Sequence, residues 1–265
     1  MLDLSKAART AEQAAYAAGT HLQASRSRLA EVMITHRAPS DVVSAIDHEA
    51  RTLIRDVVQR QFPEHHFADG TRDRDGAAAL PERGALWVVD PLDGRANYLR
   101  GYPQYAVSIA LVEDGEPRVG VVYDPCRNEF FGAIHGCGAV LNGEPIRCAP
   151  PHAASDALAA TLFPKPGSPR MPVYMTELGR VLRGFGGVRR SGSMALELAY
   201  LAAGRIDAFW EHDMAAADAA AGIVLLRESG ALIRGRDGRP PLASHSLMAC
   251  TPELFEPFLS LLAEA

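Results

Sequence analysis

The spacing of apolar residues changes near residue 86, and this change limits the chain to folds that keep helices and strands in separate layers. Residues 3–34 and 40–58 carry apolar side chains at helical spacing. From residue 86 the stretches "LWVVD", "YAVSIALVEDGEPRVGVVYDP" and "EFFGAIHGCGAVLNGEPI" have the composition and alternation of strands. Helices grouped apart from antiparallel strands are typical of layered α+β architecture.

Several short signals predict where these elements begin, break and turn. Gly19 interrupts the alanine-rich pattern, so we expect one long helix or a helix pair that is broken there. Ser40 or Asp41 is a candidate cap for the second helix. Asp114-Gly115 and Asn142-Gly143 are dipeptides that favour tight hairpin turns between strands.

A proline-rich segment at 150–173 is the predicted boundary between two halves of the chain. The N-terminal half is residues 1–150 and the C-terminal half is residues 151–265. The pattern of the second half predicts helices at 175–185, 193–204, 215–229 and 251–265, and strands at 206–211 and 230–235.

Charge, hydropathy and cysteine spacing indicate which partners and which cellular location to expect. A net charge of −5 argues against nucleic acid as the main partner. No window of the sequence approaches 18 uninterrupted apolar residues, so we expect no membrane span, and the acid at position 3 is not typical of a signal peptide. The four cysteines have no C-x-x-C spacing, which favours reduced thiols and a cytoplasmic location.

The stretch "LWVVDPLDGRANYL" places two carboxylates, Asp90 and Asp93, at the end of a buried strand. Two such groups repel each other and are costly to desolvate unless a positive charge lies near them. Carboxylate and carbonyl oxygens are the preferred ligands of hard divalent cations. Gly94 allows a sharp turn whose following amides could bind an anion, so the segment suits a phosphate ester and a cation. A simple β-turn with Asp90 as its cap is the alternative that the spacing leaves open.

Three blocks of the sequence resemble the inositol monophosphatase family of Mg²⁺-dependent, lithium-sensitive phosphatases. "WVVDPLDGRANYLRGYPQYAVSIAL" is similar to the family segment Asp-Pro-(Ile/Leu)-Asp-Gly-Thr-x-Asn-Phe after an apolar strand. "SDVVSAIDHEARTLI" looks like the start of a family helix, and "SGSMALELAYLAAGRIDAFWEHDMAAADAAAGIVLLRESGA" looks like the second signature. The blocks occur in family order, and the resemblance implies a layered αβαβα sandwich of the sugar-phosphatase type.

The resemblance also implies roles for individual residues. Asp90, Asp93 and Asp218 would supply carboxylates to a cluster of two or three Mg²⁺ ions, and the backbone carbonyl of Leu92 would join them. Asp47 matches the acid that helps to orient the attacking water. The residues that would contact the substrate are Asp93, Gly94 and Arg95 at the phosphate, the last two through backbone amides, and Gly192, Ser193 and Glu211 at the rest of the molecule.

The sequence departs from the family pattern at three places. Gly70 and Thr71 stand where the family has two glutamates, and Asp69 beside them is a candidate replacement metal ligand. Arg95 stands where the family has a threonine that works with the Asp47-type acid, and a guanidinium cannot accept a proton. Ala217 replaces a tryptophan before the last metal-binding aspartate.

The expected function is Mg²⁺-dependent hydrolysis of a small phosphorylated metabolite by a metal-activated water. Inositol 1-phosphate is one candidate substrate, and the resemblance further implies lithium inhibition and a homodimer. Two alternatives stay open. The chain could be specific for another ester, such as histidinol phosphate or a 3′-phosphonucleotide, or it could be a catalytically impaired member that acts as a regulatory or protein-binding module.

Overall fold

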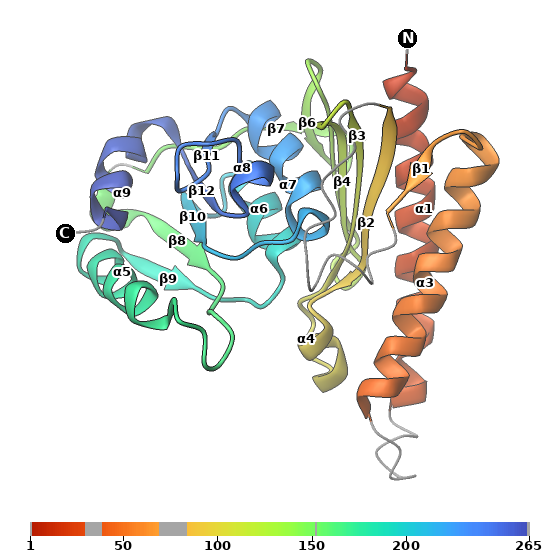
Figure 1. Ribbon diagram of the computed structural model, residues 1–265, viewed down its shortest axis with the longest axis horizontal. Coiled ribbons are helices and arrows are strands. Elements are labelled where there is room, and N and C mark those ends of the chain that lie inside the picture. The colour runs from red at the N-terminus through yellow and green to blue at the C-terminus, as the bar shows by residue number, and fades with distance from the viewer. Residues whose placement is uncertain (1, 30–38, 69–83, 152, 264–265) are drawn as a thin grey trace.

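Five layers of helix and sheet alternate through the computed structural model, which describes residues 2–29, 39–68, 84–151 and 153–263 (Figure 1). Helices α1 (Leu4–Ala24) and α3 (Pro39–Gln61) form the first layer, and a large sheet follows. Helices α6 (Met194–Ala202) and α7 (Ala216–Ser229) lie between this sheet and a second, smaller one. Helices α5 (Met171–Gly184) and α9 (Phe255–Leu262) cover the far side. The layered αβαβα fold predicted from the sequence is confirmed.

Of the two alternatives for the first segment, the structure has a helix that is not broken at Gly19, because α1 continues through this residue to Ala24. A Cβ at position 19 would lie 2.5 Å from the ring of Tyr123 on the neighbouring sheet. The glycine therefore allows close packing rather than a break. The predicted cap of the second helix is wrong: α3 begins at Pro39, a residue favoured in the first helical turn, so Ser40 and Asp41 lie inside it.

The first sheet contains, among the described residues, seven strands in sequence order, with β1 parallel to β2 and every other pair antiparallel. The strands are β1 (His66–Phe67), β2 (Ala85–Asp93), β3 (Ala106–Glu113), β4 (Glu116–Asp124), β5 (Glu129–Ile134), β6 (Gly138–Leu141) and β7 (Glu144–Ile146). Both predicted hairpin turns are confirmed. Asp114 and Asn142 have φ of 51° and 50°, and Gly115 and Gly143 have φ of 78° and 85°, as two-residue hairpin turns require.

Alternate side chains of the first sheet enter two different cores. On β2, Trp87 and Val89 pack with α1 and α3, whereas Leu86 and Val88 face α6 and α7. The close approach of α7 depends on Gly120 of β4, where a Cβ would lie 2.3 Å from the carbonyl oxygen of Ala221. The start of α7 is thereby fixed against the sheet that carries Asp90 and Asp93.

The second sheet has the order β11-β12-β10-β8-β9 within the described residues. Its strands are β8 (Leu158–Thr161), β9 (Gly187–Arg189), β10 (Ala208–Glu211), β11 (Leu232–Arg234) and β12 (Leu247–Cys250). The remaining short elements are α4 (Arg95–Arg100), α8 (Pro241–Ser244) and the 3₁₀ turns Ala154–Asp156 and Pro252–Leu254. Among the described residues, no helix combines the length and the apolar character needed to cross a bilayer.

Strands β1, β8, β9 and β12 are not predicted by the sequence pattern. β8 lies inside the proline-rich segment that predicts the boundary, and its sequence is Leu-Ala-Ala-Thr. Residues 159–161 of β8 and all four residues of β12 are buried, so no polar alternation marks either strand. The division into halves at about residue 150 stays a prediction.

Candidate active site

The junction of β2 and α4 holds the two aspartates singled out in the sequence. The pairing of β2 with β3 shifts register between Asp90 and Asp93, and Gly94 then turns the chain into α4 with φ of 93°. A Cβ at Gly94 would lie 2.8 Å from the carbonyl oxygen of Gln104. Because both the backbone angle and the contact exclude a side chain, the turn needs glycine. Oδ1 of Asp90 accepts a hydrogen bond from the amide of Leu92 at 3.1 Å.

Asp93 is joined directly to the start of α6, a hundred residues further along the chain. Its Oδ2 accepts hydrogen bonds from Oγ of Ser193 at 2.6 Å and from the amide of Ala195 at 2.8 Å. Desolvation, followed by the negative charge of Asp90, raises the pKa of Asp93 to about 7. Ser193, predicted as a substrate contact, is buried, bonds Asp93 and also caps α6. Two neighbouring carboxylates with like charges repel each other, and a bound cation would relieve this repulsion.

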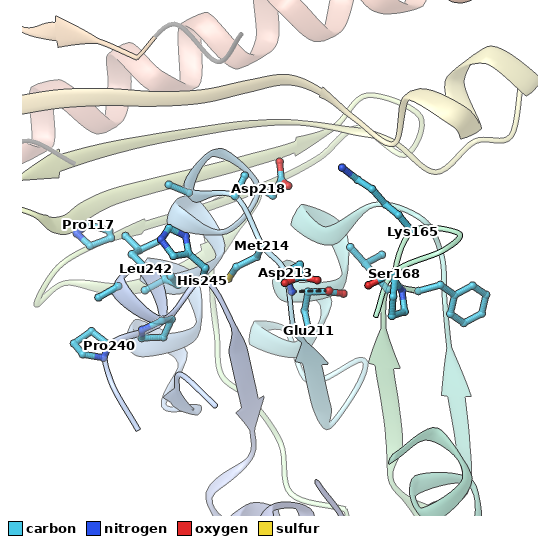
Figure 2. Close-up of a pocket in the computed structure, with 18 of the residues that line it drawn as sticks. Pro117, Lys165, Ser168, Glu211, Asp213, Met214, Asp218, Pro240, Leu242 and His245 are labelled. Atoms are coloured by element: carbon cyan, nitrogen blue, oxygen red, sulfur yellow. Dashed lines mark hydrogen bonds between the residues drawn. The ribbon is translucent and has the colours of Figure 1, made fainter. Parts of the chain in front are cut away.

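Asp218 and Glu211 line one cavity of about 1280 Å³. Figure 2 shows Glu211, Met214 and Asp218 along its middle, with Lys165 and Ser168 toward one end and Pro117, Pro240 and Leu242 toward the other. Asp218 lies in the first turn of α7, and Glu211 is the last residue of β10. The fold therefore brings these two predicted site residues to the same cavity.

Glu211 is 6% exposed, yet the described residues hold only one of its two carboxylate oxygens. Oε1 accepts hydrogen bonds from the amides of His212 at 3.0 Å and Asp213 at 3.1 Å. Oε2 is buried and has no hydrogen-bond partner in the described part of the chain. Burial raises the pKa of Glu211. A buried acceptor beside a cavity is available to a donor group of a ligand.

The residues that match metal ligands do not all meet in one described cluster. Within the described ranges, no group of three or more His, Cys, Asp or Glu side chains is arranged to hold a metal ion. Asp69, Gly70 and Thr71, where the sequence departs from the family pattern, lie outside the described residues. The donor set of Asp90, Asp93 and Asp218 still consists of the oxygen ligands that Mg²⁺ prefers.

Asp47 forms an ion pair with Arg95. Asp47 lies in α3 and is 6% exposed, and Arg95 is the first residue of α4. In the family pattern, the threonine at this position acts together with the acid that Asp47 matches. Here the guanidinium of Arg95 contacts that acid instead. The pair places Asp47 beside the junction that carries Asp93.

Asn97 holds the loop before α6 against α4. Its Nδ2 donates to the carbonyl of Ser191 at 2.8 Å and to that of Gln104 at 2.7 Å. A Cβ at Gly192, where φ is 89°, would lie 2.9 Å from this same nitrogen. The sequence does carry a signal for this residue, because Asn97 matches the asparagine of the family segment around Asp93.

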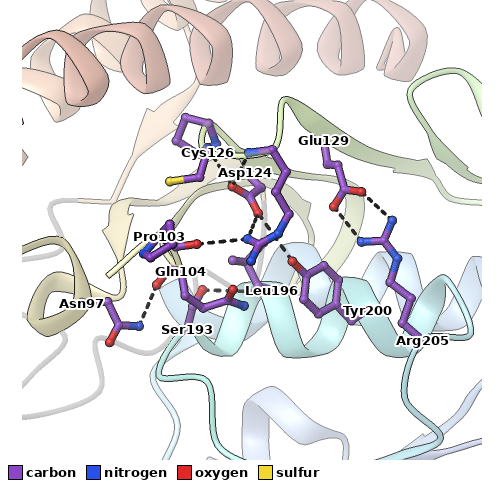
Figure 3. A network of polar contacts seen from close by, with 12 residues as sticks. Asn97, Pro103, Gln104, Asp124, Cys126, Glu129, Ser193, Leu196, Tyr200 and Arg205 are labelled. Atoms are coloured by element: carbon purple, nitrogen blue, oxygen red, sulfur yellow. Dashed lines mark hydrogen bonds and ion pairs between the residues drawn. The ribbon is translucent and has the colours of Figure 1, made fainter. Parts of the chain in front are cut away.

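A second polar network joins the turn after β4 to α6 (Figure 3). The fully buried carboxylate of Asp124 accepts hydrogen bonds from the amide of Cys126 at 2.8 Å and from Nη1 of Arg127 at 2.7 Å. Arg127 also donates to the carbonyl of Pro103 at 3.1 Å, and the hydroxyl of Tyr200 on α6 approaches Asp124 at 3.5 Å. No motif in the sequence marks Asp124. Its role follows from the tertiary contacts alone.

The chain is similar to known proteins over nearly its whole length. Residues 3–264 match the sequence model described as the inositol monophosphatase family. The chain is 37% identical over 241 residues to an inositol-1-monophosphatase of Rhizobium meliloti, with 89% of this chain and 88% of the relative covered. It is 34% identical over 249 residues to a Nus factor SuhB of Pasteurella multocida, with 94% and 92% covered.

Solved structures of inositol monophosphatases have the same fold as this chain. The structure of an inositol monophosphatase from Anabaena (Nostoc) superimposes with a TM-score of 0.84 at 31% identity, covering 99% of this chain and 96% of that one. The family model, the sequence alignments and the structural superposition each cover nearly the whole chain. The chain belongs to the inositol monophosphatase family.

Proposed function

We propose that the protein hydrolyses a small phosphate monoester with Mg²⁺ held by Asp90, Asp93 and Asp218, together with the carbonyl of Leu92. Membership in the family supports phosphatase activity on phosphate monoesters. The observation that carries the finer proposal is the placement of the carboxylates of Asp90 and Asp93 at the irregular end of β2, directly before α4, where their like charges repel each other. A bound cation would offset that repulsion. Asp218 adds a third carboxylate from a different element.

In this proposal, individual residues have the following roles in the reaction. The backbone amides of Gly94 and Arg95 would bind phosphate oxygens, and Asp47 would orient the attacking water by accepting a hydrogen bond from it. Oε2 of Glu211 would accept a hydrogen bond from the alcohol part of the ester. When bound, Mg²⁺ supplies an activated water and neutralises charge on the leaving oxygen. The protein mainly positions and screens, since phosphoryl transfer needs little covalent chemistry from side chains.

The finer predictions from the sequence also belong to this proposal. They are a cluster of two or three Mg²⁺ ions, inhibition by lithium, a homodimer, a cytoplasmic location, and contact of Gly192 with the substrate. The Rhizobium meliloti relative is an inositol-1-monophosphatase, so inositol 1-phosphate is the first ester to test.

Phosphate release from a panel of monoesters, with and without Mg²⁺, tests the proposal. The panel contains inositol 1-phosphate, histidinol phosphate, fructose 1,6-bisphosphate and a 3′-phosphonucleotide. We expect Mg²⁺-dependent release from at least one ester and loss of that release in Asp93→Asn. A folded wild-type protein that releases no phosphate from any member in Mg²⁺ contradicts it.

Relatives named Nus factor SuhB favour a second candidate, a regulatory role through protein contacts. The ion pair of Asp47 with Arg95 is consistent with it, because it engages the acid that the hydrolytic mechanism uses. The two candidates differ in outcome. The regulatory role requires no turnover and would survive Asp93→Asn, whereas the phosphatase would not.

A further inference from the structure

The strand end that presents Glu211 is tied to a buried charged cluster on the side of the second sheet away from the cavity. Glu211 is the last residue of β10 and His212 follows it directly, but the two side chains have different surroundings. Glu211 lines the cavity. His212 is 8% exposed and enters the layer that contains α5.

His212 meets a glutamate there that is itself almost fully buried. Nε2 of His212 lies 2.6 Å from Oε2 of Glu177, a residue of α5 that is 2% exposed. A carboxylate can only accept hydrogen bonds, so the imidazole donates from Nε2. The other oxygen, Oε1, is paired with the guanidinium of Arg236. Arg236 also donates to the carbonyl of Leu262 at the end of α9, at 2.9 Å.

The residues around Glu211 are held by few other contacts. Asp213 pairs with Arg170 at 2.9 Å, but the side chains of both are more than half exposed, and such pairs contribute little. The amide of Met214 donates to the carbonyl of His245 at 2.9 Å. The His212–Glu177 contact, by comparison, is buried, and it belongs to the residue whose amide donates to Oε1 of Glu211.

We infer that His212 and Glu177, with Arg236 behind them, are positioning residues that aim Oε2 of Glu211 into the cavity for the alcohol part of the substrate. This inference rests on the proposed function and adds a second layer of residues to it. A carboxylate that has one oxygen bonded by backbone amides and the other without a donor selects a ligand donor, such as a hydroxyl group, only when its orientation is fixed. The buried cluster supplies that rigidity from a side of the sheet that the substrate never touches.

The inference predicts different effects on the binding of the alcohol part and of the phosphate part of the ester, and this difference can be tested. Glu211 faces the alcohol part, whereas inorganic phosphate has no such part. We expect His212→Asn and Glu177→Gln to raise KM for the preferred ester about tenfold, leaving kcat and inhibition by inorganic phosphate within about twofold. A merely structural defect would weaken the ester and inorganic phosphate together.

A matched control is available in the same chain. Glu228 of α7 also binds a histidine, His135 at 3.5 Å, and accepts hydrogen bonds from the amides of Gly136 and Gly138. Glu228→Gln removes a comparable carboxylate outside the cavity, and we expect it to change neither KM nor phosphate inhibition. Thermal unfolding of all variants identifies any that fail to fold.

The decisive measurement is a double-mutant cycle between Glu211→Gln and His212→Asn, read as KM for the ester. If His212 acts through Glu211, adding His212→Asn to Glu211→Gln has less than twofold further effect. Full additivity, or equal loss of ester and phosphate binding in both single variants, overturns the inference. If the wild type binds the ester and phosphate but hydrolyses nothing, the proposed function fails. The same cycle is then read from dissociation constants by calorimetry with Mg²⁺ present.

Discussion

The guanidinium of Arg95 pairs with the carboxylate of Asp47, joining the middle of α3 to the first residue of α4. Asp47 is nearly fully buried, whereas 32% of the Arg95 side chain is exposed. A buried carboxylate that loses its cation keeps the desolvation cost without compensation. The pair therefore fastens the junction that carries Asp93 to the helical layer outside the first sheet.

Removing one member of this pair should destabilise the fold. We expect Arg95→Ala to lower the free energy of unfolding by about 1–2 kcal/mol, and Arg95→Ala with Asp47→Asn to lose less than the sum of the single changes. Urea unfolding measures both values. The control is Arg170→Ala, which breaks an exposed pair and should cost less than about 1 kcal/mol. Equal costs in the two arginine variants would contradict the buried role of the Asp47–Arg95 pair.

The approach of α7 to the first sheet predicts an unequal effect of two glycine substitutions. Gly120→Ala would place a methyl group 2.3 Å from the carbonyl oxygen of Ala221, so we expect a loss of about 3 kcal/mol. Gly132→Ala in β5 would meet its nearest neighbours at 3.6 Å and should change stability by less than about 1 kcal/mol. Denaturant midpoints at constant slope compare the two variants. A Gly120→Ala protein as stable as Gly132→Ala would show that α7 does not contact β4 in this way.

The ion pair of Glu129 with Arg205 predicts a pH dependence of stability. Hydrogen bonds of 2.5 and 2.6 Å from Arg205 hold the pKa of Glu129 below its usual value. A lowered folded pKa contributes stability above the unfolded pKa of about 4.3, and this stability is lost as the pH falls through the folded value. The difference in unfolding free energy between wild type and Glu129→Gln should thus be constant above about pH 5.5 and shrink below about pH 4. A difference that grows on acidification would contradict this assignment.

The placement of Asp218 predicts a change in metal dependence. It opens α7 and lines the cavity with Glu211, so Asp218→Asn should raise the Mg²⁺ concentration for half-maximal activity more than about tenfold. Phosphate release across a Mg²⁺ series measures the shift. Glu228→Gln at the other end of the same helix is the control and should leave the Mg²⁺ dependence unchanged. An unshifted Mg²⁺ curve in Asp218→Asn would remove this residue from the proposed ligand set.

Local sequence signals predict the parts of the fold that depend on neighbouring residues. The hairpin turns at Asn142-Gly143 and Asp114-Gly115 need positive φ, and the dipeptides that supply it are visible in the sequence. The sequence left open whether the first helix breaks at Gly19, because the glycine serves a contact with Tyr123, which lies far away in the chain. Strand β8 escapes prediction because its small buried residues show no alternation.

The candidate site also has residues that the sequence predicts and contacts that it does not. Asp90, Asp93, Asp218 and Glu211 are marked by their motifs, and the fold places the first two together and the last two in one cavity. The Asp47–Arg95 pair and the His212–Glu177 contact join residues from distant segments. The resemblance already relates position 95 to Asp47, but no local pattern relates His212 to Glu177, so the sequence predicts the first contact and not the second.

A crystal structure of the protein grown with Mn²⁺ tests the central claim most directly, because Mn²⁺ accepts the same oxygen ligands as Mg²⁺ and gives an anomalous signal. The account predicts at least one anomalous peak bound by carboxylate oxygens of Asp90, Asp93 and Asp218, at about 2.0–2.3 Å, and its loss in Asp93→Asn. A well-ordered crystal at millimolar Mn²⁺ with no peak at these carboxylates would contradict it.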